Sequence, residues 1–597
     1  MKHLGLLISL IIVASLVVAC ATPTPEVVKE VVTQVVEVEK EVTKIVAGTP
    51  VVEKVVETKV VEKEVTKIVE VEKVVTATPP PKEVVLRRAR QQDPKGLDPH
   101  VRGSVGGGLV PIFALYDQLV KLEGETLDVG PALAESWEVP DPTTYIFHLR
   151  KGVKFHDGTE FNAEAVRFNA ERVMTLGELP GGYWLKSVDS VEVLDDYTVQ
   201  MNLNAPYVAW LATLAGERSG SYQVSPACVE EHKTADDPWA AEWLYDHDCG
   251  TGPYMLEEYI SEDRIVMTKF PDYWRGWEGK HVDKIIEMVV KEAATRRFLV
   301  EKGEVDLADL PTEFVPAMQE NADVTVDIRP SLMVYTFYLN VNKFPTDDIN
   351  VRKALNHAYD YQGSVDVIHL GYGDRPVGPM SKSEWPVWED APVYEYDLDK
   401  ARAILEEGGW VDTNGDGIRE KDGQDLNLHM LLADFETWRK MALLLQDGVA
   451  EIGGNMDIEW VTWPIEFEAI TKPPEEKPYN VTGSWAYLTV PDPHERLWQR
   501  WHSDTATDGY NAAGLMNPEL DALLDEAIQL VDREERIPLY IEAQKLLFED
   551  MPGIFVIAGD NIAFYRTWVK NFLYNPGLQG LIHWYDLYIE DRPPEFD

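Results

Sequence analysis

Side chains able to do chemistry are few in this sequence, and three cysteines are the clearest of them. Cys20 directly follows a short apolar run near the start of the chain. Cys228 and Cys249 are the two others, and in an exported protein they would most simply form a disulfide with each other. The histidines nearby do not have the spacing of a zinc site, so we expect no metal there.

An acidic loop at residues 412–417 is a second candidate for chemistry. It places side-chain oxygens at its first, third and fifth positions and glycine at its sixth, as in the first half of a calcium-binding loop. The twelfth position, where a bidentate glutamate is needed, is Gly423. A plain surface turn is therefore favoured over a calcium site.

Motifs for covalent catalysis do not occur in the sequence. There is no GxSxG, HExxH or P-loop pattern, and the many acidic pairs do not single out a glycosidase dyad. The glycines of Gly250–Tyr254 lack both the GxGxxG spacing and a P-loop lysine. We therefore expect a binding protein that is not an enzyme and uses no cofactor.

Aromatic side chains supply a different kind of chemistry. Trp485, Tyr487 and Trp501 offer flat apolar area that could stack on a sugar ring. The same three residues could equally be aromatic residues of a core, and the sequence leaves both interpretations open.

Length and charge limit the possible classes of protein. A chain of 597 residues has room for two to four domains. Its net charge is −48, and residues 21–82 hold 11 Glu and 9 Lys, so nearly all of the acidity lies in the remainder. Such a surface repels nucleic acid and anionic lipid, and we expect no nucleic-acid partner.

Residues 1–20 have the pattern of a secretory signal. Lys2 and His3 precede an apolar run from Leu4 to Ala19, which is too short for a comfortable membrane span. The sequence Val-Val-Ala before Cys20 resembles the bacterial lipobox, which implies a lipid anchor on Cys20. The alternative is an ordinary signal peptide followed by an incidental cysteine.

Residues 21–83 form a low-complexity segment of Val, Glu, Lys and Thr. The nonapeptide VEKEVTKIV occurs at 38–46 and again at 61–69, and valines from Val28 to Val42 recur at heptad-like spacing. An alternating-charge spacer and a transient coiled coil are the two interpretations, the spacer being favoured because valine is a poor helix former. In either form, the segment would tether the folded body and hold it clear of the cell envelope.

The most regular stretch of the body lies between Pro131 and Arg172. Alternating apolar residues at Tyr145, Phe147 and Leu149 predict a strand with one buried face. Asp157-Gly158 is a tight-turn signal, and Asn162 is placed to cap a helix. We therefore expect a strand, a turn and a capped helix in sequence.

This stretch resembles the extracytoplasmic solute-binding proteins of ABC transporters, family 5, the peptide/nickel group. The resemblance is carried by Ala132–Trp137, Phe147–Lys151, Phe155–Gly158, Phe161–Glu164 and Gly250–Tyr254. It implies a two-lobed α/β periplasmic-binding-protein fold of type II, with mixed sheets, a hinge, an interlobe cleft and an extra inserted subdomain. Lobe I would comprise residues 84–127, 249–330 and 561–597, the inserted subdomain 128–248, and lobe II 331–560.

The resemblance also implies which residues line the cleft. The expected set is Ser104, Met333, Tyr335, Trp485, Tyr487, Thr489, Asp492 and Trp501. Thr489 stands where the oligopeptide binders carry an aspartate that pairs with the peptide α-amino group. Ordinary peptides are therefore in doubt as ligands, unless Asp492 takes over this role.

Together these features predict a lipid-anchored extracytoplasmic protein that captures a solute and delivers it to an ABC permease. The solute would be a peptide or peptide-like molecule, with an oligosaccharide or a nickel–chelator complex as alternatives. A surface sensor that keeps the fold but has lost transport is the remaining alternative.

Overall fold

The computed structural model describes residues 26–46, 49–69, 83–94, 96–101, 109–177, 187–216, 220–486, 488, 490–578 and 582–596. The chain divides into two compact units, residues 1–82 and residues 83–597. Cys20 lies outside the described residues.

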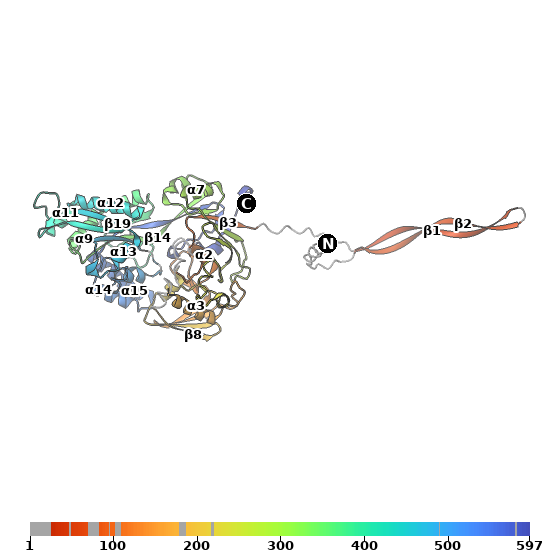
Figure 1. Ribbon diagram of the computed structural model, residues 1–597, viewed down its shortest axis with the longest axis horizontal. Helices are drawn as coiled ribbons and strands as arrows, with labels where there is room; N and C mark the ends of the chain where they lie inside the picture. Colours follow the sequence, from red (N-terminus) through yellow and green to blue (C-terminus); the bar gives the residue numbers. More distant parts are fainter. Residues whose placement is uncertain are drawn as a thin grey trace. The chain divides into compact units, whose positions relative to one another are not determined.

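The first unit contains a long β-hairpin. Strands β1 (Glu26–Val46) and β2 (Thr49–Val69) pair antiparallel from Glu26 opposite Val69 to Val46 opposite Thr49 (Figure 1). The coiled-coil interpretation is therefore wrong. More than half of each strand is Val, Ile or Thr, whose branched Cβ atoms favour extended backbone, and this preference outweighs the heptad-like spacing.

A mixed sheet of 11 strands runs through the second unit, in the order β10-β11-β12-β3-β13-β21-β14-β20-β18-β19, with β15 paired to β21. Its strands are β3 (Val85–Arg90), β10 (Tyr254–Ile260), β11 (Arg264–Lys269), β12 (Lys284–Val289), β13 (Leu307–Ala308), β14 (Val324–Leu339), β15 (Gly373–Asp374), β18 (Asn427–Ala433), β19 (Asn455–Val461), β20 (Val481–Ala486) and β21 (Gly553–Arg566).

Strands β14 and β21 pair antiparallel over most of their length and connect the two halves of this sheet. At one end, Val324 and Phe564 pack in a core cluster with residues of β3, β13 and α7. At the other end, Phe337 and Ile554 pack with α9 and α12. The predicted lobe boundaries, after residues 330 and 560, fall inside these strands at Pro330 and Asp560, which are paired.

Helices cover both faces of the half of the sheet that contains β14, β18 and β20. Phe337 and Leu339 belong to one buried cluster, whereas Tyr338 between them belongs to another, so the two clusters lie on opposite faces. The helices of this half are α9 (Ile349–Ala358), α10 (Tyr361–Gly363), α11 (Leu398–Glu407), α12 (Glu436–Glu451), α13 (Trp463–Ile470), α14 (Pro518–Ala527) and α15 (Arg533–Asp550).

A separate four-stranded antiparallel sheet, in the order β6-β7-β9-β8, lies within residues 128–248, the predicted inserted subdomain, which we call the inserted region. The predicted unit is confirmed, since Tyr145, Phe147 and Leu149 are the buried residues of β7, and Asn162 accepts a hydrogen bond from the backbone N–H of Ala165 to cap α3. The strands are β6 (Ala134–Asp141), β7 (Thr144–Leu149), β8 (Val188–Asp195) and β9 (Thr198–Leu203), and the helices α3 (Ala163–Leu176), α5 (Trp210–Ala215) and α6 (Pro226–His232).

The remaining elements are short. They are α2 (Leu109–Leu115), β4 (Val120–Leu122), β5 (Val129–Pro131), α7 (Ala293–Lys302), α8 (Val315–Gln319), β16 (Glu420–Lys421), β17 (Gln424–Asp425), β22 (Val569–Lys570) and β23 (Tyr588–Ile589).

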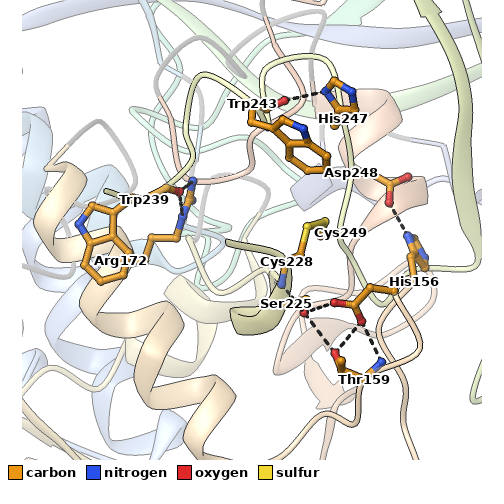
Figure 2. The surroundings of a disulfide bond; sticks show 11 residues. His156, Thr159, Arg172, Ser225, Cys228, Trp239, Trp243, His247, Asp248 and Cys249 are labelled. Atoms are coloured by element: carbon orange, nitrogen blue, oxygen red, sulfur yellow. Dashed lines mark hydrogen bonds and ion pairs between the residues drawn. A yellow bond between two sulfur atoms is a disulfide. The ribbon is translucent and has the colours of Figure 1, made fainter. Parts of the chain in front are cut away.

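A disulfide joins Cys228 of α6 to Cys249, with 6.4 Å between their Cα atoms. Figure 2 shows the polar contacts around it. Next to Cys249 in the chain, Asp248 Oδ1 lies 2.7 Å from His156 Nδ1, and the other ring nitrogen of His156 lies 2.9 Å from the carbonyl oxygen of Gly252. Because both ring nitrogens face acceptors, both hydrogen bonds of His156 are satisfied when the ring carries both protons.

The stability of the protein should therefore depend on the charge of His156. Burial lowers its pKa, but the Asp248 carboxylate and the Gly252 carbonyl outweigh burial, and the net pKa is raised. A raised histidine pKa stabilises the fold fully below the unfolded value of about 6.5, and this contribution is lost as pH rises through the folded pKa. Chemical denaturation at a series of pH values above about 6.5 should show a fall in unfolding free energy that His156→Gln removes. An identical fall in both proteins would contradict this assignment.

Candidate functional site

Aromatic side chains gather at the carboxyl edge of three parallel strands. Strand β18 is parallel to both β19 and β20, so the carboxyl ends of all three meet at one edge, the usual place for ligand sites in α/β sheets. Phe435 and Trp463 each follow the paired ends of β18 and β19 by two residues. Trp485 is the penultimate residue of β20.

These residues contact one another around Trp485. The Trp485 ring lies 5.1 Å from Phe435, 6.4 Å from Trp463 and 6.4 Å from Trp438, with both tryptophan neighbours within about 22° of parallel to it. Tyr335 of β14 is paired with Trp485 across the sheet, and its ring lies 5.5 Å from Trp438. We call Tyr335, Phe435, Trp463 and Trp485, with Trp438 beneath them, the aromatic surface.

The aromatic surface is open at its outer part and closed at its base. Phe435 and Trp463 are each 41% exposed, Tyr335 and Trp485 are half-buried, and Trp438 is 1% exposed. Adjacent large apolar side chains with this exposure are typical of a binding surface rather than of a core. The arrangement can stack against a flat apolar group of a solute.

The predicted site residues fall into three groups. Met333, Tyr335 and Trp485 lie close together on the paired strands β14 and β20, all three half-buried. Ser104, Tyr487 and Thr489 lie outside the described residues, so their roles remain predictions.

Trp501 and Asp492 have surroundings that do not suit a ligand contact. Trp501 is 1% exposed and packs between Tyr338 and Phe555 in the core cluster that includes α14 and α15, so the core interpretation applies to it. Asp492 is 6% exposed and accepts hydrogen bonds from Arg536 at 2.6 and 3.0 Å. Because its charge is paired inside the protein, Asp492 is not placed to bind an α-ammonium group of a peptide.

Four residues of the site were missed in the sequence, namely Phe435, Trp438, Trp463 and His369. Phe435 and Trp463 could have been found as aromatic residues that closely follow two strands, one of them, β18, largely apolar. His369 lies 5.5 Å from the Tyr335 ring in a T-shaped contact, and burial lowers its pKa to about 4. Its neutral ring therefore extends the aromatic surface without adding positive charge.

Two cavities lie along the connecting strands. One, of about 400 Å³, lies where Arg329 of β14 meets Trp385, Arg533 and Tyr574. Arg533 donates to Asp128 at 3.0 Å, and its guanidinium lies 3.9 Å from the Trp385 ring. The positive charge of Arg533 is therefore already paired with a carboxylate. The other, of about 410 Å³, lies beside β3, β13 and β21 and shares Tyr574 with the first. Each has the volume of a small-solute site.

The loop at 412–417 closes on itself as a turn. The Asp412 carboxylate accepts hydrogen bonds from the backbone N–H groups of Gly415 and Gly417 at 2.6 and 3.0 Å, and Asp416 accepts from Ile418.

Within the described part of the chain, no helix is both long and apolar enough to cross a membrane.

Comparisons with known proteins identify the family of this chain. The family model for bacterial extracellular solute-binding proteins, family 5 Middle, matches residues 128–508. The probable D,D-dipeptide-binding periplasmic protein DdpA of Escherichia coli is 29% identical, over 85% of this chain and 95% of its own length. Heme-binding protein A of Haemophilus influenzae is also 29% identical, over 77% of this chain and 85% of its own.

Solved structures give the same result. The ABC transporter-associated periplasmic binding protein DppA of Helicobacter pylori, in complex with the peptide STSA, is 25% identical and superposes with a TM-score of 0.69, covering 85% of this chain and 98% of that one. NikA of Brucella suis, in complex with Fe(III)-EDTA, is 24% identical with a TM-score of 0.73, covering 85% and 100%. With the family model matching more than half of its residues, this chain belongs to the bacterial extracellular solute-binding proteins of family 5.

Proposed function

We propose that this protein captures a peptide-like solute on the aromatic surface and delivers it to the permease of an ABC importer. The observation that carries the proposal is the position of the aromatic surface, at the carboxyl edge of β18, β19 and β20 and next to the connecting strand β14. A relative described as a probable D,D-dipeptide-binding protein, and a solved structure in complex with the peptide STSA, support a peptide-like solute.

Capture would follow from closure of the two halves of the large sheet about β14 and β21. These two strands are the long connections between the halves, and their pairing is irregular between Pro330 and Val334. Closure over the aromatic surface would remove water from the solute and create the surface that the permease recognises. No covalent step is needed.

An oligosaccharide is the second candidate solute. It is favoured by the flat area of Trp463 and Trp485, which suits the apolar face of a sugar ring, and by the pairing of Asp492 with Arg536, which removes one candidate partner for a peptide ammonium group.

The nature of residue 489 gives a test of the solute. A threonine cannot replace the charge of an aspartate, so a free α-ammonium group on the peptide should add little to the binding free energy. Calorimetry with alanyl-phenylalanine and its N-acetylated form should give dissociation constants within about tenfold of each other. Free-peptide binding more than about tenfold tighter would overturn the assignment at Thr489. Binding of neither form would contradict peptide capture, and the same titration with a neutral oligosaccharide then tests the second candidate.

The anchor is a further part of the proposal. The Val-Val-Ala sequence before Cys20 supports lipidation of that cysteine and attachment to the outer face of the cytoplasmic membrane. Cys20→Ala should move the protein from the membrane fraction to the soluble fraction when it is expressed in a bacterium. A soluble wild type, or a variant that stays with the membrane, would contradict the lipid anchor.

A further inference from the structure

A third cavity, of about 310 Å³, lies between the inserted region and the helical half of the molecule. One wall contains Tyr207, from the loop after β9, and the other contains Trp498 and Tyr510. These walls are held together by the backbone N–H of Val208, which donates to the carbonyl oxygen of Ile528 at 3.2 Å. The cavity shares no lining residue with the aromatic surface or with the two cavities along β14 and β21.

Among the described residues, the charged side chains that line this cavity are acidic, and outside the lining the Arg500 guanidinium lies 5.2 Å from the Tyr510 ring. The lining includes the carboxylates of Glu495, Asp508 and Asp525, and none of its residues in the described part of the chain is Lys or Arg. Glu495 is 6% exposed, so its carboxylate lies in the wall rather than in bulk solvent. A negative cavity with apolar walls attracts a cation more strongly than an open acidic surface does, because the walls exclude water.

His494 provides an independent reason to expect a ligand. It lines the cavity, is 7% exposed, and its Nδ1 has no hydrogen-bond partner among the described residues. Burial lowers the pKa of His494 to about 3, so the ring is neutral and retains an unsatisfied polar atom. The ring lies 5.4 Å from Trp498 and 5.9 Å from Tyr207, between the two walls.

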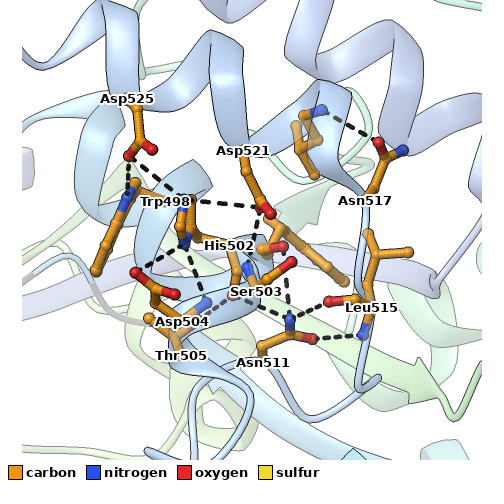
Figure 3. A network of polar contacts seen from close by, with 12 residues as sticks. Trp498, His502, Ser503, Asp504, Thr505, Asn511, Leu515, Asn517, Asp521 and Asp525 are labelled. Carbon is orange, nitrogen blue, oxygen red and sulfur yellow. Dashed lines mark hydrogen bonds and ion pairs between the residues drawn. The ribbon is translucent and has the colours of Figure 1, made fainter.

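Trp498 and Asp525 are held in place by their neighbours. The indole N–H of Trp498 donates to Asp525 Oδ1 at 3.3 Å, and His502 stacks on Trp498 with 4.8 Å between ring centroids. Figure 3 shows Trp498 and His502 both directed toward Asp525, with His502 Nε2 3.3 Å from the same carboxylate oxygen. The Trp498 indole, on which the His494 and His502 rings both stack, and the Asp525 carboxylate are thus fixed side by side at the cavity.

We propose that this cavity binds a small organic ammonium ion, with its apolar part against Trp498 and its charge facing Asp525. Aromatic faces carry negative electrostatic potential, and together with the carboxylates they favour a cation that also has apolar surface. A neutral molecule of the same shape would gain the stacking but not the charge interaction, and an anion would be repelled.

The test is calorimetric titration of the full-length protein with 2-phenylethylammonium chloride and with its neutral analogue 2-phenylethanol. Asp525→Asn removes the charge but keeps an acceptor for the Trp498 N–H, and should weaken ammonium binding about tenfold. Glu526→Gln makes the same change at the next position of α14, which does not line the cavity, and should leave binding unchanged. Trp498→Ala, as a separate single variant, should weaken ammonium binding about tenfold or more.

Three results would overturn the proposal. One is the absence of saturable binding of 2-phenylethylammonium at millimolar concentrations, and another is binding of 2-phenylethanol with equal affinity. The third is ammonium binding that survives Trp498→Ala but is lost in Trp485→Ala, since the ion would then occupy the aromatic surface. Because Asp525→Asn changes an exposed side chain, it gives a result even if the Trp498 variant fails to fold.

Discussion

Arg172→Met is expected to lower the free energy of unfolding by about 3–5 kcal/mol. Arg172 of α3 is fully buried and donates to both carboxylate oxygens of Asp98, at 2.9 and 2.5 Å. It also donates to Nδ1 of His100 at 2.9 Å and to the carbonyl oxygen of Trp239. Its removal leaves the Asp98 carboxylate, whose side chain is 3% exposed, buried without a cation. Urea denaturation followed by circular dichroism measures the loss.

Arg167→Met is the matched control for this experiment. Arg167 lies on the same helix and pairs with Glu164 and Glu171, but its side chain is 40% exposed. Exposed pairs of this kind are worth about 1 kcal/mol or less, so the control should unfold almost as the wild type does. Equal losses in the two variants would show that the buried network has no special weight.

Trp485→Ala is expected to weaken solute binding by about 30-fold or more, corresponding to 2 kcal/mol or more. Trp485 is in ring contact with Phe435, Trp438 and Trp463, so its removal takes away the centre of the aromatic surface. A central aromatic residue in a desolvated site usually contributes most of the binding free energy. Titration with the solute that the wild type binds gives the ratio of dissociation constants.

Phe298→Ala tests whether the effect belongs to the aromatic surface. Phe298 of α7 is a large apolar residue that is 50% exposed and belongs to another part of the fold. This variant should bind the solute as the wild type does. A similar loss in both variants would point to a general effect of removing an exposed aromatic side chain.

Local features could be predicted from the sequence because their causes are local. The strand containing Tyr145 and Phe147 and the helix capped by Asn162 each depend on residues within a few positions of one another. The segment 21–83 was harder, because repeated valines fit both a heptad seam and a strand, and the β-branched side chains decided in favour of the strand.

The candidate site depends on contacts that are distant in the sequence. Phe435, Trp463 and Trp485 come together only because β18 pairs with both β19 and β20, an order that no single stretch of sequence specifies. Trp501 is a tryptophan like Trp485 and was predicted with it as a site residue. The packing of α14 and α15 nevertheless encloses Trp501 in the core. Residue type identified the kind of surface, and strand order determined which residues form it.

The aromatic surface is expected to hold the solute that this protein captures. The most direct measurement starts with the full-length protein purified from its own bacterium. The protein is denatured, and the small molecules that it releases are identified by mass spectrometry. The released solute is then titrated into fresh protein. The expected result is a peptide-like or sugar solute that binds again to the wild type but not to Trp485→Ala at the same concentration. A solute that binds equally to both proteins, or a wild type that releases nothing able to bind again, would contradict this expectation.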